Sequence, residues 1–363
     1  MIPAFSMCRL SIKAQGREFQ AFFRPLPPPS VTLFGRDTMP DAIVPIRAVQ
    51  FSRQHLSRQW RPVHHDADAP PKVEDLPTSL TLITWNVDFL KDFADQRLTT
   101  ALDYLRDETF REYKTAELPF CIILLQEIEI GTFNALLAHP WVKEWFMVVP
   151  GKPADGWPRG AWYGTATLVR KGSWLAGSTC VHFGESQMGR NALVTDVMVR
   201  GPGAEPHARR KLRVVNTHLE SLPEGAASRV VQLGVITDLL GEAEAGGIVG
   251  GDMNAISPSD ATLAAQNGLL DAWEEDQERR DRGWREGSGS EDEDEGGMTW
   301  GYQPRCKFPP GRLDKILYTE SDAFEVKGIR RLGIGLRMPY HGGWVSDHYG
   351  LSCRVEFRQT TKN

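Results

Sequence analysis

Four polar tips on apolar runs constrain the fold of this chain more than any other feature. In chain order they are TWN at 84–86, QE at 126–127, GDMN at 251–254 and SDH at 346–348. Apolar runs precede the first three tips, and an apolar segment follows the fourth. Short apolar runs that end in polar residues are typical of buried strands. We therefore expect four buried strands that converge at one edge of a core, where their polar tips lie close together.

Length and composition allow one large folded domain with an appendage. The chain has 363 residues, 41% of them hydrophobic and 25% charged, which fits a domain of roughly 250 residues plus an extension. Its five cysteines show no CxxC spacing, so neither a disulfide framework nor a structural zinc site is expected. No apolar stretch reaches the roughly 18 residues of a membrane span, and the N-terminus lacks a signal-peptide pattern. We expect no membrane partner.

Residues 1–77 differ from the rest of the chain. They contain a proline run at 27–29, a basic segment at 50–61 and a stretch rich in Pro, Asp and His at 62–77, with little sustained periodicity. We predict an N-terminal extension and linker there, partly disordered. From residue 81 almost to the end of the chain, strand-like and helix-like segments alternate, which predicts one mixed α/β domain.

Periodicity within that domain predicts particular elements. Helical spacing occurs at 98–114 and 226–240. Further strands are predicted at 164–170, 193–199, 212–216, 313–318 and 351–357. An acidic, low-complexity insert at 276–297 has the composition of a solvated surface loop. A sharper alternative is a mimic of nucleic-acid charge that regulates access to a site.

The overall charge limits the contacts that the chain makes with nucleic acid. The net charge is −5 and the pI is near 6.0, unlike proteins that hold DNA through many phosphates. Any such contact is therefore expected to be local. The first 30 residues carry one acid, Glu18, against four basic residues, Arg9, Lys13, Arg17 and Arg24. A transit peptide is one interpretation of this pattern, but we favour a nuclear or cytoplasmic location over a mitochondrial one.

The polar tips supply the groups that phosphodiester hydrolysis needs, which are a cation, a group that activates water and donors for the nonbridging oxygens. Glu127 ends an apolar run and offers the hard oxygen ligand that suits Mg²⁺ or Mn²⁺. Asn86 cannot titrate, so its amide suits orienting a phosphate, a metal-bound water or Glu127. Taken alone, Glu127 could equally be a surface glutamate that ends a strand.

Two further tips suggest acid–base and donor groups. Asp252 and Asn254 are two residues apart, so in an extended backbone both project to one side, as a candidate base or metal partner and an amide donor. A turn at GDMN is the alternative. His348 would act best on a phosphoryl oxygen if a carboxylate held its other ring nitrogen. Adjacent side chains on a strand point opposite ways, which favours the distant Asp314 over Asp347 as that partner.

The ordered set TWN, QE, NTHLES, GDMN, RLD and SDH resembles the endonuclease/exonuclease/phosphatase superfamily of Mg²⁺-dependent phosphohydrolases over about residues 81–357. HLES at 218–221, MGRNALV at 188–194 and SDHYGL further resemble its 5′-tyrosyl-DNA phosphodiesterases. The resemblance implies a four-layered α/β sandwich, two packed mixed β-sheets flanked by helices, as a catalytic domain at 78–358. It also implies hydrolysis, in DNA repair, of the bond between a topoisomerase tyrosine or peptide and a DNA 5′ phosphate. We expect a monomer.

Carried over residue by residue, the resemblance assigns metal binding to Glu127, with Asn86 supporting it and Asp347 near the metal or its waters. Asp252 and Asn254 would position and activate the attacking water. The expected cofactor is Mg²⁺, with Mn²⁺ as a substitute.

The resemblance assigns the remaining groups to the phosphoryl oxygens and to single-stranded DNA ends. His348, oriented by Asp314, and His218 would stabilise the transition state, although a lone histidine such as His218 is more often structural. The implied DNA groove contains an aromatic and polar set, Tyr163, Arg190, Ser221 and Trp300. Aromatic faces stack on bases without sequence preference, but Trp300 could also be core filler.

The chain departs from the animal 5′-tyrosyl-DNA phosphodiesterases at Ile256 and Leu313, where a basic and an aromatic residue are usual, and both departures concern the DNA groove. Other superfamily activities therefore remain open, namely an abasic-site endonuclease, an RNA deadenylase, a sphingomyelinase or an inositol-phosphate phosphatase. A pseudoenzyme that binds DNA ends is the third interpretation, but it would be expected to lack a core residue.

Overall fold

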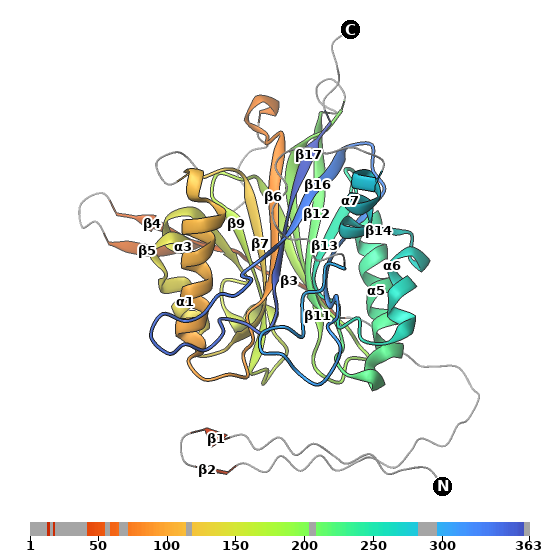
Figure 1. The fold of residues 1–363 in the computed structure, drawn as a ribbon. Helices are drawn as coiled ribbons and strands as arrows, with labels where there is room; N and C mark the ends of the chain where they lie inside the picture. The colour runs from red at the N-terminus through yellow and green to blue at the C-terminus, as the bar shows by residue number, and fades with distance from the viewer. Residues whose placement is uncertain are drawn as a thin grey trace. The chain divides into compact units, whose positions relative to one another are not determined.

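The chain divides into two compact units, Met1–Thr38 and Met39–Asn363. The computed structural model describes residues 13–14, 17–18, 42–54, 59–64, 72–113, 118–202, 208–281 and 296–358. In the first unit, β1 (Lys13–Ala14) and β2 (Arg17–Glu18) form an antiparallel pair. The second unit contains two β-sheets packed together, with helices on their outer faces (Figure 1).

The larger sheet has eight strands in the order β16-β17-β6-β7-β9-β8-β4-β5. β6 and β7 are parallel, and the other neighbouring pairs are antiparallel. The strands are β4 (Val49–Arg53), β5 (Trp60–His64), β6 (Ser79–Asn86), β7 (Cys121–Glu129), β8 (Phe146–Val149), β9 (Tyr163–Arg170), β16 (Phe324–Leu332) and β17 (Gly350–Phe357).

The smaller sheet has seven strands in the order β14-β15-β13-β12-β11-β10-β3. β12 and β13 are its parallel pair, and the other neighbouring pairs are antiparallel. The strands are β3 (Ala42–Pro45), β10 (Leu175–His182), β11 (Asn191–Arg200), β12 (Arg209–His218), β13 (Gly247–Asp252), β14 (Leu269–Asp271) and β15 (Asp314–Thr319).

The central strands are apolar on both faces because each face contributes to a different core. Leu82 of β6 lies in the core between the sheets, together with Val214 and Ile316 from the smaller sheet. The next residue, Ile83, points the other way and packs in a second core with Leu98 of α1 (Ala94–Tyr104). A strand buried on both faces reads as a continuous apolar run, which is why the sequence predicted it.

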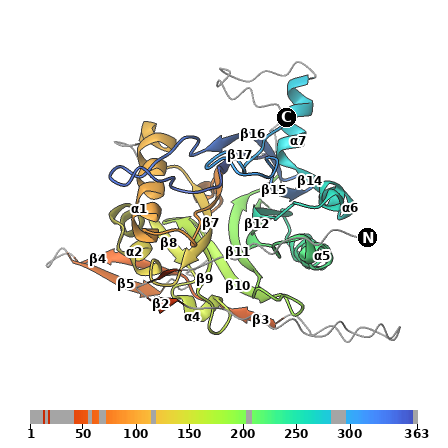
Figure 2. The same ribbon diagram turned by 60° about the horizontal axis from the view of Figure 1, so that its bottom comes forward.

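Helices cover the outer face of each sheet. The α-helices after α1 are α2 (Phe133–Ala138), α3 (Pro140–Trp145), α4 (Pro153–Gly156), α5 (Ala226–Gly241), α6 (Leu263–Gln266) and α7 (Ala272–Asp281). α1, α2 and α3 pack on the larger sheet, and α5 and α6 pack on the smaller one. Figure 2 shows α1 and α5 on opposite sides of the paired sheets. This arrangement confirms the predicted four-layered α/β sandwich. No helix in the described ranges is long and apolar enough to cross a membrane.

The compact unit begins earlier than the predicted domain boundary at residue 78. β3 lies at the edge of the smaller sheet, and β4 and β5 lie at the edge of the larger one. These strands are four or five residues long, and all of β3 is exposed, so they lack the alternation that marks a half-buried strand. Pro45 and Pro62 further mask the pattern, although prolines are compatible with edge strands.

The other predicted elements are present with small differences in length. The five further strands correspond to β9, β11, β12, β15 and β17, and the second predicted helix is α5. The first predicted helix instead consists of α1, a π-helical turn at Leu105–Thr109 and a 3₁₀ turn at Arg111–Tyr113. The start of the predicted acidic insert belongs to α7, whereas 282–295 lies outside the described residues.

A buried arginine on α5 ties together the loops after β12 and β13. The Arg229 side chain is fully buried, and its Nη2 lies 2.7 Å from Oδ2 of Asp260. Its Nη1 donates to the carbonyl oxygens of Glu220 and Leu222 at 3.0 and 2.9 Å. We expect Arg229→Met to lower the free energy of unfolding by about 3–5 kcal/mol, because Asp260 would stay buried without its cation. Urea denaturation measures this loss.

Arg280→Met is the matched control for that measurement. Arg280 is 56% exposed and forms an i,i+4 ion pair with Asp276 at 2.8 Å, so its loss should change the free energy of unfolding by at most about 1 kcal/mol. Equal losses for the two variants would show that the Arg229 pair does not stabilise the fold beyond a surface pair.

Candidate active site

All four polar tips lie at one end of the paired sheets. Asn86 and Asp252 are the last residues of β6 and β13, and His218 is the last residue of β12. Asp314 begins β15 and is paired in register with Asp252, because these strands are antiparallel. His348 lies just before β17, which is antiparallel to β6. The expected convergence is therefore present.

Asn86 links the two carboxylates at the centre of the cluster. Its Nδ2 donates to Oε1 of Glu127 at 3.1 Å and to Oδ2 of Asp252 at 3.0 Å. Its Oδ1 accepts the backbone N–H of Asp88 at 3.0 Å, and the side chain is fully buried. The amide therefore holds both carboxylates toward one point, and its contact with Glu127 is one of those expected from the sequence.

A β-bulge aims Glu127 into the site. The register of β7 against β9 shifts between Leu125 and Ile128, and Glu127 has a left-handed φ of 58°. Such a φ is uncommon for a residue other than glycine, and bulges often redirect a side chain next to a functional site. Oε2 of Glu127 also accepts the backbone N–H of Phe89 at 3.1 Å. Burial raises the pKa of Glu127 to about 7.

The extended conformation predicted for Asp252 and Asn254 is wrong. β13 ends at Asp252, and Asn254 has a left-handed φ of 47°. Oδ1 of Asp252 accepts the backbone N–H of Asn254 at 2.9 Å, which closes a turn of the kind that Asp and Asn favour. Nδ2 of Asn254 donates to the carbonyl oxygen of Leu219 at 3.0 Å. Burial raises the pKa of Asp252 to about 6.

His348 and Asp314 form the carboxylate–histidine pair expected from the sequence. Nδ1 of His348 lies 2.7 Å from Oδ2 of Asp314, which is fully buried. The other ring nitrogen lies 3.9 Å from Oδ2 of Asp252 and 4.0 Å from Oδ1 of Asp347. Burial lowers the pKa of His348, but attraction to these carboxylates outweighs it and raises the pKa well above its usual value. We therefore assign His348 as a cation in this arrangement.

His218 has the opposite character. Its Nδ1 lies 2.9 Å from Nη1 of Arg190, and its Nε2 lies 3.4 Å from Oδ2 of Asp252. A guanidinium only donates, so Nδ1 must accept and the proton of the neutral ring is on Nε2. Burial and the Arg190 charge both lower the pKa of His218 well below its usual value. The site thus holds one protonated and one neutral histidine.

An aromatic and polar wall stands beside Glu127 and His218. Tyr163 stacks on Phe89 with ring centroids 3.8 Å apart, and the Arg190 guanidinium lies 5.5 Å from the Tyr163 centroid. Nη2 of Arg190 donates to Oγ of Ser221 at 2.8 Å. The structure therefore joins Tyr163, Arg190 and Ser221, three of the residues predicted for the groove. Sequence reasoning missed Phe89, whose only signal was its position three residues after Asn86.

Trp300, the fourth predicted groove residue, contacts a different part of the site. Its Nε1 donates to Oδ2 of Asp347 at 3.1 Å, and its ring is only partly buried. Trp300 is thus not core filler. Asp347 is 31% exposed and reaches the site from the side of His348.

Two sets of side chains offer ligand atoms close enough together to hold a metal ion. They are Glu127, His218 and Asp252, and then Asp252, Asp314 and His348, each set within 4.8 Å. Within the described ranges, neither Glu127 nor Asp252 forms an ion pair with a lysine or arginine. Converging carboxylates, of which Asp252 is buried and Glu127 partly buried, need positive charge, and oxygen donors suit a hard divalent cation. The two carboxylates of the first set, Glu127 and Asp252, with the amide of Asn86 beside them, fit such an ion best.

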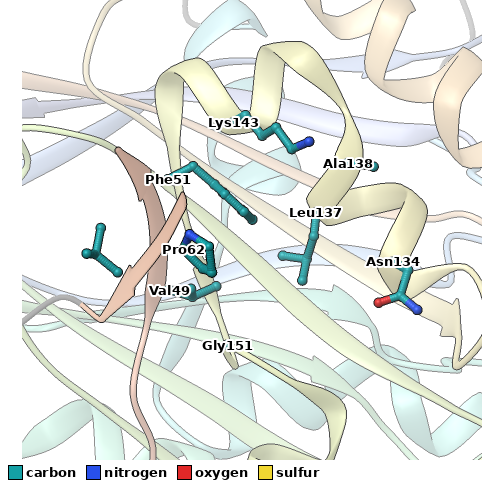
Figure 3. A pocket seen from close by; sticks show the side chains of 9 residues that line it. Val49, Phe51, Pro62, Asn134, Leu137, Ala138, Lys143 and Gly151 are labelled. Atoms are coloured by element: carbon teal, nitrogen blue, oxygen red, sulfur yellow. The ribbon is translucent and has the colours of Figure 1, made fainter. Parts of the chain in front are cut away.

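A large open pocket in the described part of the chain lies elsewhere. It measures about 500 Å³ and lies between the β4–β5 hairpin and α2 and α3, with mainly apolar side chains around it (Figure 3). None of the polar tips lines it. A hollow of about 20 Å³, with room for one water molecule, does adjoin the candidate site and is lined by Tyr163, Arg190 and His218 among others.

Comparisons with known proteins agree with this fold. The model of the endonuclease/exonuclease/phosphatase family matches residues 83–348, and the chain belongs to that family. It is therefore a hydrolase of the phosphodiesterase type.

Within this family, the chain is similar to several proteins named tyrosyl-DNA phosphodiesterase 2. Tyrosyl-DNA phosphodiesterase 2 of Danio rerio is 29% identical over 297 residues, which cover 78% of this chain and 68% of that protein. The crystal structure of the Caenorhabditis elegans protein matches with a TM-score of 0.58 and 20% identity, over 78% of this chain and 76% of that one. The Danio rerio protein complexed with single-strand DNA product matches with a TM-score of 0.56 and 23% identity, over 77% and 99%. These structures share the fold of this chain.

Proposed function

We propose that this chain is a Mg²⁺-dependent phosphodiesterase that hydrolyses the bond between a tyrosine and a DNA 5′ phosphate. The carrying observation is the convergence of Glu127 and Asp252 on Asn86, beside the His348–Asp314 pair. The substrate class is supported by the relatives named tyrosyl-DNA phosphodiesterase 2, one of which was crystallised with a single-strand DNA product.

The metal would be held by Glu127 and Asp252, with Asn86 keeping their oxygens in place. His218 belongs to the same group of ligand atoms, but its proton is on Nε2, so it acts as a donor. A bound divalent cation supplies positive charge to the oxygens of the phosphoryl group. Asp347, which is partly exposed beside His348, is placed to contact water around the site.

The contacts of the two histidines favour a carboxylate as the base. His348 carries its proton, and the only free nitrogen lone pair of His218 is engaged by Arg190, so neither accepts a proton from water. We infer that Asp252, which lies 3.4 Å from Nε2 of His218, takes that proton, while Asn254 fixes the direction of its carboxylate. Nε2–H groups of both histidines then donate to the phosphoryl oxygens as charge develops there.

The wall beside the metal ligands suits the end of a single DNA strand. The Phe89–Tyr163 stack offers an aromatic face, and Arg190 and Ser221 offer donors next to it. Aromatic stacking and phosphate pairing bind single strands without reading their sequence. Trp300 would contact the strand on the side of Asp347. We propose a monomer that acts in DNA repair in the nucleus or cytoplasm.

A panel of substrates tests this proposal against other activities of the family. Purified protein with Mg²⁺ is given a 5′-phosphotyrosyl oligonucleotide, an abasic duplex and polyadenylate in parallel. We expect preferred cleavage of the phosphotyrosyl bond. Preferred cleavage of either other substrate would keep the phosphodiesterase centre and reject the proposed substrate.

Metal removal gives a second expected result. EDTA should abolish turnover, and added Mg²⁺ or Mn²⁺ should restore it, because the converging carboxylates need a divalent cation to bind an anionic phosphodiester. The rate is followed on the phosphotyrosyl oligonucleotide and on bis(p-nitrophenyl) phosphate. Full turnover in excess EDTA would reject the metal centre.

A further inference from the structure

The buried carboxylate of Glu220 accepts several hydrogen bonds from the turn at 183–190, between β10 and β11. Glu220 is 3% exposed, and its Oε1 accepts the backbone N–H groups of Gln187 and Met188 at 3.1 and 3.0 Å. Its Oε2 accepts the hydroxyl of Ser186 at 2.8 Å. The same hydroxyl oxygen accepts the backbone N–H of Arg190 at 2.7 Å. A single side chain thus bonds to both the tip of the turn and, through Ser186, its last residue.

Two buried side chains of α5 also bond to Glu220. Gln232 of α5 donates from Nε2 to Oε2 of Glu220 at 3.0 Å and accepts its backbone N–H at 2.9 Å. Arg229 donates to its carbonyl oxygen at 3.0 Å. Both partners are buried, so the carboxylate is fixed to α5 as well as to the turn.

The turn delivers Arg190 to the candidate active site. The Arg190 guanidinium contacts Nδ1 of His218 at 2.9 Å and Oγ of Ser221 at 2.8 Å, and it lies over Tyr163. Its Nε is buried and without a hydrogen-bond partner. Arg190 is thus fixed at both ends, through its guanidinium and through its backbone N–H. A movement of the turn would therefore displace the guanidinium and, with it, the His218 ring.

We propose that Glu220 is a positioning residue that sets the place of Arg190, and through it the orientation of His218, by holding the 183–190 turn. The inference rests on the proposed function, since Arg190 and His218 act on the phosphodiester there. Glu220 lies between His218 and Ser221 in the chain. One short segment therefore supplies two groups at the site and the carboxylate that holds the 183–190 turn. Displacement of a positioned group by about 1 Å can cost about 10²-fold in rate.

Glu220→Gln tests this positioning role. The substitution keeps the shape of the side chain, but its NH₂ group would face a hydrogen-bond donor where a carboxylate oxygen of Glu220 now accepts. We expect kcat/KM to fall about 10- to 100-fold on both the phosphotyrosyl oligonucleotide and bis(p-nitrophenyl) phosphate. Glu224→Gln, an exposed glutamate in the following turn, should match wild type. Hydrogen exchange at the 186–190 amides should be faster in Glu220→Gln alone.

A double-mutant cycle with Arg190→Ala separates positioning from general loss of structure. If Glu220 acts through Arg190, the double variant is no slower than Arg190→Ala alone. Multiplied losses in the double variant, or wild-type turnover and exchange in Glu220→Gln, would overturn the proposal. If Glu220→Gln does not fold, Ser186→Ala takes its place in the cycle. Wild type that turns over only bis(p-nitrophenyl) phosphate would reject the DNA substrate, and the cycle on that compound would still decide the role of Glu220.

Discussion

Asp252→Ala is expected to lower turnover of the phosphotyrosyl oligonucleotide by at least about 10²-fold, the loss typical of removing a general base. Asp252 is nearly fully buried, accepts a hydrogen bond from Asn86 and lies 3.4 Å from Nε2 of His218. Its loss removes both the proposed proton acceptor and one of the two carboxylates that would hold the metal. Burial raises the pKa of this group to about 6, so at pH 7.5 the wild-type carboxylate is mainly ionised.

The control for this variant is Asp238→Ala, which removes an exposed carboxylate from α5. Rates are compared at saturating Mg²⁺, and thermal unfolding shows whether each variant folds. Near-normal turnover by a folded Asp252→Ala variant would contradict its role as base and metal ligand.

His348→Gln is expected to lower kcat by about 10²- to 10⁴-fold. Glutamine keeps a donor near the same place but cannot carry the positive charge that Asp314, at 2.7 Å from Nδ1, supports on the ring. Asp314→Asn should also lower kcat, because an amide does not stabilise a charged imidazole as a carboxylate does. Single-turnover rates at saturating protein isolate this step from product release.

His341→Ala is the comparison for His348→Gln. His341 lies in the loop that precedes β17, is exposed and stacks on Phe93 with ring centroids 4.0 Å apart, so its loss should leave the single-turnover rate unchanged. A His348→Gln variant as fast as His341→Ala would show that no positive charge is needed at that position.

The sequence predicted those parts of the site that buried strands position. β6, β7 and β13 are apolar on both faces, so their ends could be located and their polar tips placed together. The pairing of His348 with Asp314 followed from the opposite directions of neighbouring strand residues. Both depend on regular backbone geometry, which a single sequence reveals well.

Irregular backbone and tertiary contacts were beyond that reasoning. The bulge that aims Glu127 and the turn that closes on Asp252 leave no periodic pattern. Phe89 and Glu220 act through contacts to residues 38 and 32–34 positions away, and no local signal marks such pairs. The short edge strands were missed because their exposure obscures alternation.

The most direct test of the central claim is identification of the products from a 5′-phosphotyrosyl oligonucleotide with Mg²⁺. We expect free tyrosine and a 5′-phosphorylated oligonucleotide in equal amounts, formed by wild type and lost in Asp252→Ala. Internal cleavage of the strand, or release of tyrosine at the same rate by both proteins, would contradict a 5′-tyrosyl-DNA phosphodiesterase built on this site.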